Sequence, residues 1–459
     1  MKRTAAFLIA TLLCFTPAIA QESPGLFDRI FGGSESQDAE EDPGGFLERL
    51  IEDNLSGEGR DVEITGFEGA LGGRGTFETF TISDPDGVWL TLRDVVVDWN
   101  RGALLPRRIE VAELSAATIE LPRLPTPAEA KGPSPEAGGF SLPELPVSVS
   151  IEGLTVDRIE IGAPVFGVET AASLNGSLSL ASGDGAATLD VKRLNGNGSL
   201  VLDTSYSNAS ENLALDLRLA EDADGIVANL LGLPGRPPLE FSIIGEAPLS
   251  EYTAEIALAT EGQDRLQGQI TTLVPQDTPG VTRTTRAALQ GDIAPLFNAD
   301  YQPFFGPNVS LNATITTFET GQTDISDLRV SAESLSLTGE IKIASGGLPT
   351  EIDVSGSIAN ATNTAVLLPL SGPETRVGAV DLSVTFDETR NDAWTGRFAI
   401  VGLDRPGFSA DSLTLDASGQ IKSQSPQSVT ANLLFDASAL DLGNPDAEKA
   451  LGEQVQGQM

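Results

Sequence analysis

Side chains of alternating polarity recur through most of this chain, and this two-residue period restricts the fold more than any other feature. Leu213, Leu215 and Leu217 alternate with small or polar residues, and Leu382 and Val384 do the same much later. Successive side chains of a β-strand point to opposite faces, so this period marks strands with one apolar face. Turns rich in Gly, Asn and Asp separate such segments. We therefore predict a mainly-β protein, an elongated antiparallel sheet with few short helices.

One set of aliphatic residues is predicted to lie on the apolar face of this sheet. These candidate lining residues are Leu90, Leu92, Leu178, Leu180, Leu213, Leu215, Leu217, Ile256, Leu258, Leu335, Leu337, Val380, Leu382 and Val384.

A continuous aliphatic face of this length must be covered. Roughly 20 strands at a spacing of about 4.8 Å would extend on the order of 100 Å, and soluble monomers do not expose so large an apolar surface. The sheet can close into a barrel or sandwich and fill its interior with side chains. Alternatively, it can curl into an open groove for acyl chains, since each buried CH₂ contributes about 0.8 kcal/mol. The residues by themselves favour neither arrangement.

The N-terminus has the pattern of a secretory signal. Lys2 and Arg3 precede an apolar run, and Ala18 and Ala20 form a cleavage site before Gln21. The run is shorter than the roughly 20 residues that a membrane-spanning helix needs. A cleaved signal is therefore favoured over a retained anchor.

Composition and periodicity predict the remaining organisation. The predicted segments are a signal peptide (1–20), an acidic flexible linker (21–43), a capping helix with the first strands (44–121), a Pro-rich loop (122–146), the β-groove body (147–445) and a short C-terminal helix before a truncated end (446–459). Within the body, residues 225–233 and 293–305 are predicted to be partly helical.

Composition also excludes several functional classes. The chain has 66 acidic and 28 basic residues, a net charge of −38, which disfavours nucleic acid and anionic membrane surfaces as partners. It has no histidine, and its one cysteine, Cys14, lies in the signal, so no disulfide and no His or Cys metal site is expected. The turn at 84–87 lacks the spacing of a calcium loop. We predict no catalytic site, no metal and no cofactor, with a β-helix carbohydrate enzyme as a minor alternative.

Several segments resemble the N-terminal part of the TamB family of envelope proteins, of the alphaproteobacterial type, in their order and spacing. They are residues 46–56, 64–71, 88–105, 109–122, 230–234, 291–297, 304–307 and 367–370.

This resemblance implies a periplasmic β-groove protein, related to the AsmA-like lipid-bridge proteins and associated with the inner membrane at its N-terminal end. Such a protein carries phospholipid between the inner and outer membranes and takes part in outer-membrane protein assembly with a barrel of the TamA type. The candidate lining residues would then contact phospholipid acyl chains in an open groove. Family members are longer than this chain and commonly keep an N-terminal anchor. The alternative is a secreted β-rich scaffold or adhesin with a filled core and no lipid.

Overall fold

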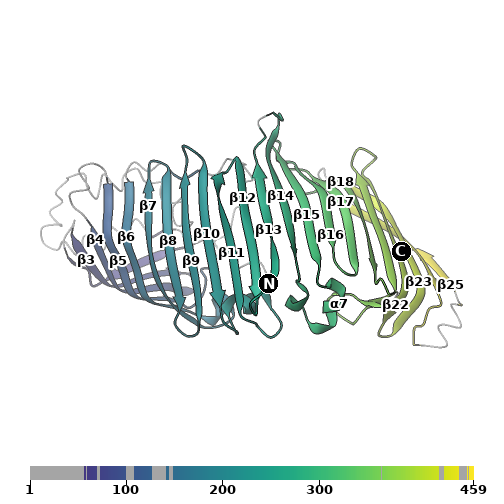
Figure 1. Ribbon diagram of the computed structural model, residues 1–459, viewed down its shortest axis with the longest axis horizontal. Coiled ribbons are helices and arrows are strands. Elements are labelled where there is room, and N and C mark those ends of the chain that lie inside the picture. The colour runs from purple at the N-terminus through teal and green to yellow at the C-terminus, as the bar shows by residue number, and fades with distance from the viewer. Residues whose placement is uncertain are drawn as a thin grey trace. The chain divides into compact units, whose positions relative to one another are not determined.

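The computed structural model describes most of the chain after residue 55. The described residues are 56–57, 59–69, 73–99, 108–126, 141–143, 148–275, 277–362, 364–422, 428–443, 452 and 454–458. The predicted signal peptide, acidic linker and capping helix lie outside these residues, apart from Ser56. In the described part there are 25 strands and only short helices, which confirms the mainly-β prediction (Figure 1). None of the described helices is long and apolar enough to cross a membrane.

The chain divides into two compact units between Pro248 and Leu249. The strands of unit 1 are β1 (Asp61–Thr65), β2 (Glu68–Gly69), β3 (Arg74–Asp84), β4 (Gly87–Trp99), β5 (Arg108–Leu121), β6 (Ser148–Ile161), β7 (Thr170–Ala181), β8 (Asp184–Arg193), β9 (Gly198–Ser207), β10 (Asn212–Glu221) and β11 (Leu239–Pro248). The sheet of unit 1 curls, and in Figure 1 its pale first strands pass behind its later strands.

Unit 2 contains the remaining strands. They are β12 (Glu251–Thr260), β13 (Gln263–Leu273), β14 (Val281–Gly291), β15 (Val309–Phe318), β16 (Thr323–Ser331), β17 (Leu335–Ile343), β18 (Pro349–Ala359), β19 (Val366–Leu367), β20 (Arg376–Val377), β21 (Ala379–Asp387), β22 (Ala393–Arg405), β23 (Phe408–Lys422), β24 (Ser428–Ser438) and β25 (Gln454–Gln458).

Neighbouring strands in each unit pair mostly in chain order and antiparallel, as predicted. The exception is β5 with β6, which pair in parallel from Arg108↔Ser148 to Leu121↔Ile161. Adjacent parallel strands need a long crossover connection, and the Pro-rich segment 122–146 lies in that position. The segment thus joins two strands of one unit, and the boundary between the units falls elsewhere, after Pro248.

Long connections recur at regular strand intervals. The connection at 222–238 follows β7–β10, the one at 292–308 follows β11–β14, and the one at 360–378 follows β15–β18. The other connections on the same side of the sheet in this region, at 261–262 and 332–334, are tight turns. In each unit we call the row of strand ends that carries the long connections the capped rim, and the opposite row, with shorter connections, the turn rim.

The predicted helical segments are partly confirmed. Residues 225–233 contain α6 (Ile226–Leu231), and residues 293–305 contain η2 (Ala294–Leu296), η3 (Ala299–Tyr301) and α7 (Gln302–Phe305). A further helix, α5 (Ala163–Phe166), was not predicted. The predicted C-terminal helix is wrong over its described end, because β25 pairs with β24 there and gains ladder hydrogen bonds that an isolated short helix lacks.

Candidate functional site: the apolar face of the sheet

The candidate lining residues of unit 1 share one face of its sheet. Strand pairing joins apolar residues across neighbouring strands, and alternation along β7 and β10 places Leu178, Leu180, Leu213, Leu215 and Leu217 on the same side. One such cross-strand row reads Val95, Ala116, Val156, Leu174, Val191, Leu200, Leu219 and Phe241. Leu90 and Leu92 lie on this face too, because Leu92 pairs with Ile119 and Ile119 with Ile159.

Unit 2 repeats this arrangement. One row crosses eleven strand pairs and reads Ile256, Gly268, Leu289, Leu311, Val330, Leu337, Gly356, Leu382, Phe398, Leu415, Phe435 and Gly457. Leu258, Leu335, Val380 and Val384 lie on the same face by alternation along their strands. The sequence prediction that these side chains point to one side is therefore confirmed within each unit.

Most of these residues are not packed as a filled core would pack them. Leu213, Leu215 and Leu217 are half-buried, and Leu178 is 38% exposed. In unit 2, Ile256 and Leu258 are also half-buried. Fully packed interiors bury aliphatic side chains almost completely. Much of the apolar face therefore has room for further apolar contacts.

The apolar face of unit 2 is filled at its capped rim. Phe304 from α7, Val366 from β19 and Val377 from β20 form a buried cluster with Val380. Leu335 packs against this cluster, and Phe305 stacks on Phe297 with ring centroids 3.9 Å apart. Two of the candidate lining residues, Leu335 and Val380, thus contribute to a local hydrophobic core instead of an open surface.

Backbone hydrogen bonds hold α7 on the strand ends. Ser334 N donates to Phe304 O at 3.0 Å, and Glu333 N donates to Phe305 O at 2.9 Å. Because α7 follows β14 while β19 follows β18, the cluster joins two connections that are separated by the four strands β15–β18. In Figure 1, α7 lies at the lower ends of the strands of unit 2.

Unit 1 has a comparable cap. The helix α5 follows β6 and α6 follows β10, so the strands β7–β10 lie between the two helices in sequence. The helices nevertheless contact each other, and Asn229 Nδ2 of α6 donates to Phe166 O of α5 at 3.2 Å. The N-terminus of α6 is held by Glu221, whose carboxylate accepts from Val227 N at 3.1 Å and Ala228 N at 2.8 Å. These bonds satisfy two N–H groups that the first helical turn leaves without partners. Each unit thus closes one rim of its apolar face with short helices or loops.

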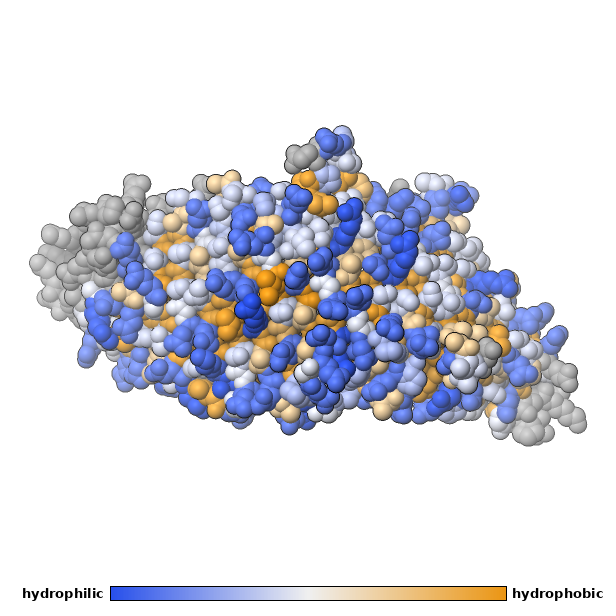
Figure 2. All heavy atoms as spheres, viewed as in Figure 1, coloured by the Kyte–Doolittle hydropathy of each residue, from blue (hydrophilic) through white to orange (hydrophobic). Residues whose placement is uncertain are grey.

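The opposite face of each sheet is polar. On β17, Ser336, Thr338 and Glu340 are exposed while Leu335 and Leu337 between them are half-buried. Figure 2 shows hydrophilic side chains over most of the surface in view, with hydrophobic side chains visible between them. Charge repulsion between such acidic surfaces opposes association through exposed strand edges.

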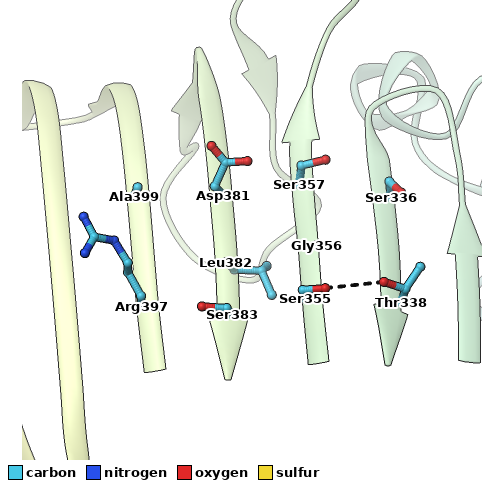
Figure 3. A pocket seen from close by; sticks show the side chains of 10 residues that line it. All are labelled: Ser336, Thr338, Ser355, Gly356, Ser357, Asp381, Leu382, Ser383, Arg397 and Ala399. Carbon is cyan, nitrogen blue, oxygen red and sulfur yellow. Dashed lines mark hydrogen bonds between the residues drawn. The ribbon is translucent and has the colours of Figure 1, made fainter. Parts of the chain in front are cut away.

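A shallow depression of about 420 Å³ lies on this polar face in unit 2 (Figure 3). Small hydroxyl residues line it, with Thr338 Oγ1 and Ser355 Oγ 3.4 Å apart. Arg397 at its edge is 3.5 Å from Asp416 and so already has an ionic partner. The depression follows from the small size of the Ser and Gly side chains and contains no pair of groups suited to acid–base catalysis.

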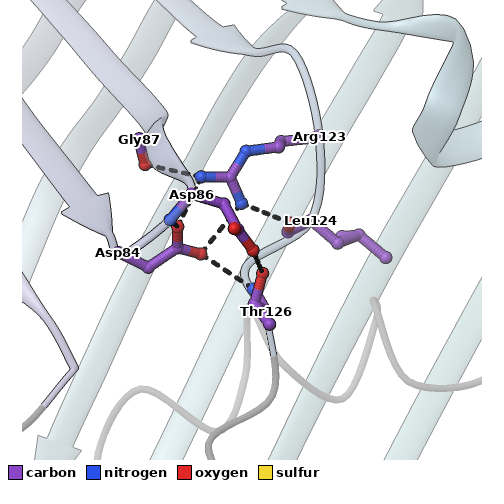
Figure 4. Close-up of polar contacts among 6 residues, drawn as sticks. All are labelled: Asp84, Asp86, Gly87, Arg123, Leu124 and Thr126. Carbon is purple, nitrogen blue, oxygen red and sulfur yellow. Dashed lines mark hydrogen bonds and ion pairs between the residues drawn. The ribbon is translucent and has the colours of Figure 1, made fainter.

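The acidic turn at 84–87 forms a clamp on the start of the crossover (Figure 4). Arg123 donates to both carboxylate oxygens of Asp84, at 2.5 and 2.8 Å, and Thr126 N donates to Asp84 Oδ2 at 2.8 Å. Arg123 chiefly, and the Thr126 amide next, hold the pKa of Asp84 well below its usual range. With its oxygens engaged, Asp84 is not an available metal ligand, and no group of residues suited to a metal ion occurs in the described part of the chain.

A polar side chain on the apolar face of unit 2, Tyr252, was missed by the sequence analysis. Tyr252 is 9% exposed, and its hydroxyl is buried without a hydrogen-bond partner in the part that the structure describes. It pairs across the strands with Thr272, whose hydroxyl lies 3.3 Å from that of Thr285. Tyr252 lies on the same face as Ala254, Ile256 and Leu258 by the two-residue period of the strand. The sequence therefore already indicated its position, as the first member of an apolar stripe.

Comparisons of the chain with protein-family models, with curated proteins and with solved structures find no match.

Proposed function

We propose that this protein binds the acyl chains of phospholipids on the apolar face of its sheet and carries them between the inner and outer membranes of a cell envelope. The observation that supports this proposal most directly is the incomplete burial of many aliphatic side chains on this face in both units, such as Leu215 and Ile256. A contact of this kind is non-directional and scales with apolar area, so an acyl chain can shift along a row without breaking specific bonds.

The chemistry of the face supports an apolar ligand. Its rows consist mostly of Leu, Ile, Val, Phe, Ala and Gly, with single polar members such as Thr204 and Tyr252, and the ladder hydrogen bonds of the sheet satisfy the backbone groups beneath them. The resemblance to the TamB family supports the same interpretation, a periplasmic location at the inner membrane and a role in outer-membrane protein assembly with a TamA-type barrel. The cluster around Phe304 favours, locally, the alternative of a filled-core scaffold without lipid.

The test is mass spectrometry of lipid extracted from the purified chain and from Leu215→Arg and Val384→Arg variants. An arginine among half-buried aliphatic residues can extend its charge to solvent while it blocks the row, so both variants should stay folded and lose lipid. Matched controls are Ala220→Arg and Ser383→Arg, which place the same charge on exposed positions of the polar face of β10 and β21.

Two results would contradict the proposal. One is a folded wild-type protein without lipid. The other is unfolding of both face variants with folded controls, because that outcome indicates a filled core in which an unpaired charge is buried.

A further inference from the structure

The apolar face of unit 2 has different chemistry at its two rims. The capped rim is closed by Phe304, Val366 and Val377. Near the turn rim of β12–β14, one row reads Tyr252, Thr272 and Thr285, three hydroxyl side chains on adjacent strands, and the same row continues as Ile315 and Ile325 on β15 and β16. On β12–β14, an amphiphile therefore meets apolar side chains such as Ile256 and Leu289 toward the capped rim and hydroxyl groups toward the turn rim.

Tyr252 is the distinctive member of this row. Buried polar groups almost always have hydrogen-bond partners, so a buried hydroxyl without one needs an explanation. Thr272 and Thr285 have hydroxyls within 3.3 Å of each other, whereas the Tyr252 hydroxyl has no partner in the described part of the chain. Burial raises the pKa of Tyr252, so the phenol stays protonated and able to donate at neutral pH.

An unpaired cation lies on the same face near this row. Arg283 is two residues from Thr285 on β14, toward the turn rim, and its backbone lies opposite Thr317 of β15 in the strand register. Its side chain is exposed, and no described acidic residue forms an ion pair with it. In a chain of net charge −38, a free guanidinium at the margin of an apolar surface is unusual. It can bind a phosphate through two parallel hydrogen bonds.

We propose that Tyr252 and Arg283 form a headgroup site for a phospholipid whose acyl chains lie on the apolar face of unit 2 and point toward the capped rim. Strand spacing places the two residues about 10 Å apart across the sheet and about 7 Å along it, which suits the glycerol esters and the phosphate of one lipid. Tyr252 Oη donates to an ester carbonyl or a phosphate oxygen, and Arg283 binds the phosphate. This site rests on the proposed lipid binding and adds a ligand orientation to it.

The experiment measures binding of two fluorescent probes to the full, delipidated chain. Phosphatidylcholine and diacylglycerol carry the same acyl chains and the same acyl-chain fluorophore, so they differ only in the phosphocholine group. Arg283→Gln should weaken phosphatidylcholine binding by about tenfold and leave diacylglycerol binding unchanged, since only one probe offers a partner for a charged hydrogen bond. Tyr252→Phe removes one hydroxyl and should weaken phosphatidylcholine binding by about fivefold.

The matched control is Arg286→Gln, which removes an exposed arginine from the opposite face of the same strand. It should leave the binding of both probes at wild-type values. Equal affinities of Arg283→Gln, Arg286→Gln and wild type for phosphatidylcholine would overturn the headgroup site, as would unchanged binding by Tyr252→Phe. Displacement of the lipid by millimolar inorganic phosphate would also overturn it, because a free-phosphate site would then be present. If wild type binds neither probe, the proposed function itself fails.

Discussion

Two truncations in unit 2, one inside the Phe304 cluster and one outside it, should lower the free energy of unfolding by clearly different amounts. Phe304 is 6% exposed and packs in the cluster with Val366 and Val377. Phe304→Ala removes an almost fully buried ring and leaves a cavity, so it should lower the free energy of unfolding by about 4 kcal/mol. Leu337 is half-buried on the same face. Full burial of a leucine contributes about 1.5–3 kcal/mol, and half of that, with no enclosed cavity, gives about 1 kcal/mol for Leu337→Ala.

Urea unfolding followed by the fluorescence of Trp394 measures both values. The chain has three tryptophans, Trp89, Trp99 and Trp394, and replacing the first two with Phe makes the signal specific for unit 2. The reasoning is refuted if Leu337→Ala lowers the free energy of unfolding by 3 kcal/mol or more, a loss typical of a closed core. A loss below about 1 kcal/mol for Phe304→Ala would equally contradict the packing of the cap.

Three further predictions concern local structure. The urea midpoint of Asp84→Asn should lie below that of wild type. Because Arg123 lowers the folded-state pKa of Asp84 below its ordinary value of 3.8, the difference between the two midpoints should be complete at higher pH and shrink only below about pH 3.8. A difference that already shrinks at pH 6 would contradict this prediction. Glu221→Ala removes two hydrogen bonds to the first turn of α6 and should lower the free energy of unfolding by about 1 kcal/mol, measured by urea titration. Gly268→Ala would place a Cβ 2.0 Å from Ala288 O and should lower it by about 3 kcal/mol or more, whereas Gly346→Ala, with open space around the new methyl group, should leave thermal stability nearly unchanged.

The faces of the strands could be predicted from sequence because alternation is a local property. Leu213, Leu215 and Leu217 need no distant partner to reveal that they share a side. Local apolar spacing between Gly and Pro residues also predicted α6 and the helical turns near α7. It could not show which strand lies beside which, so the parallel pairing of β5 with β6 was missed.

The caps and the surroundings of Tyr252 depend on contacts between residues distant in sequence. Phe304 and Val377 meet only because the strands between them bring 292–308 and 360–378 to the same rim. Leu335 and Val380 are core residues because these two connections meet over them. The pattern of their own strands does not show this. For Tyr252, the sequence showed its position in a stripe but not that its hydroxyl lacks a partner. The long Pro-containing connections were the available signal for the caps, and only local helices were predicted in two of them, 222–238 and 292–308.

The regular placement of the long connections bears on how such a chain can evolve in length. A duplicated segment of four strands with one long connection begins and ends on the same side of the sheet, so it can be inserted without reversing any later strand. It also brings its own cap residues. An insertion of two strands would preserve the alternation of faces, but it would shift the long connections relative to the partners that they contact. Growth in steps of four strands therefore extends the apolar face while each added segment remains closed along one side.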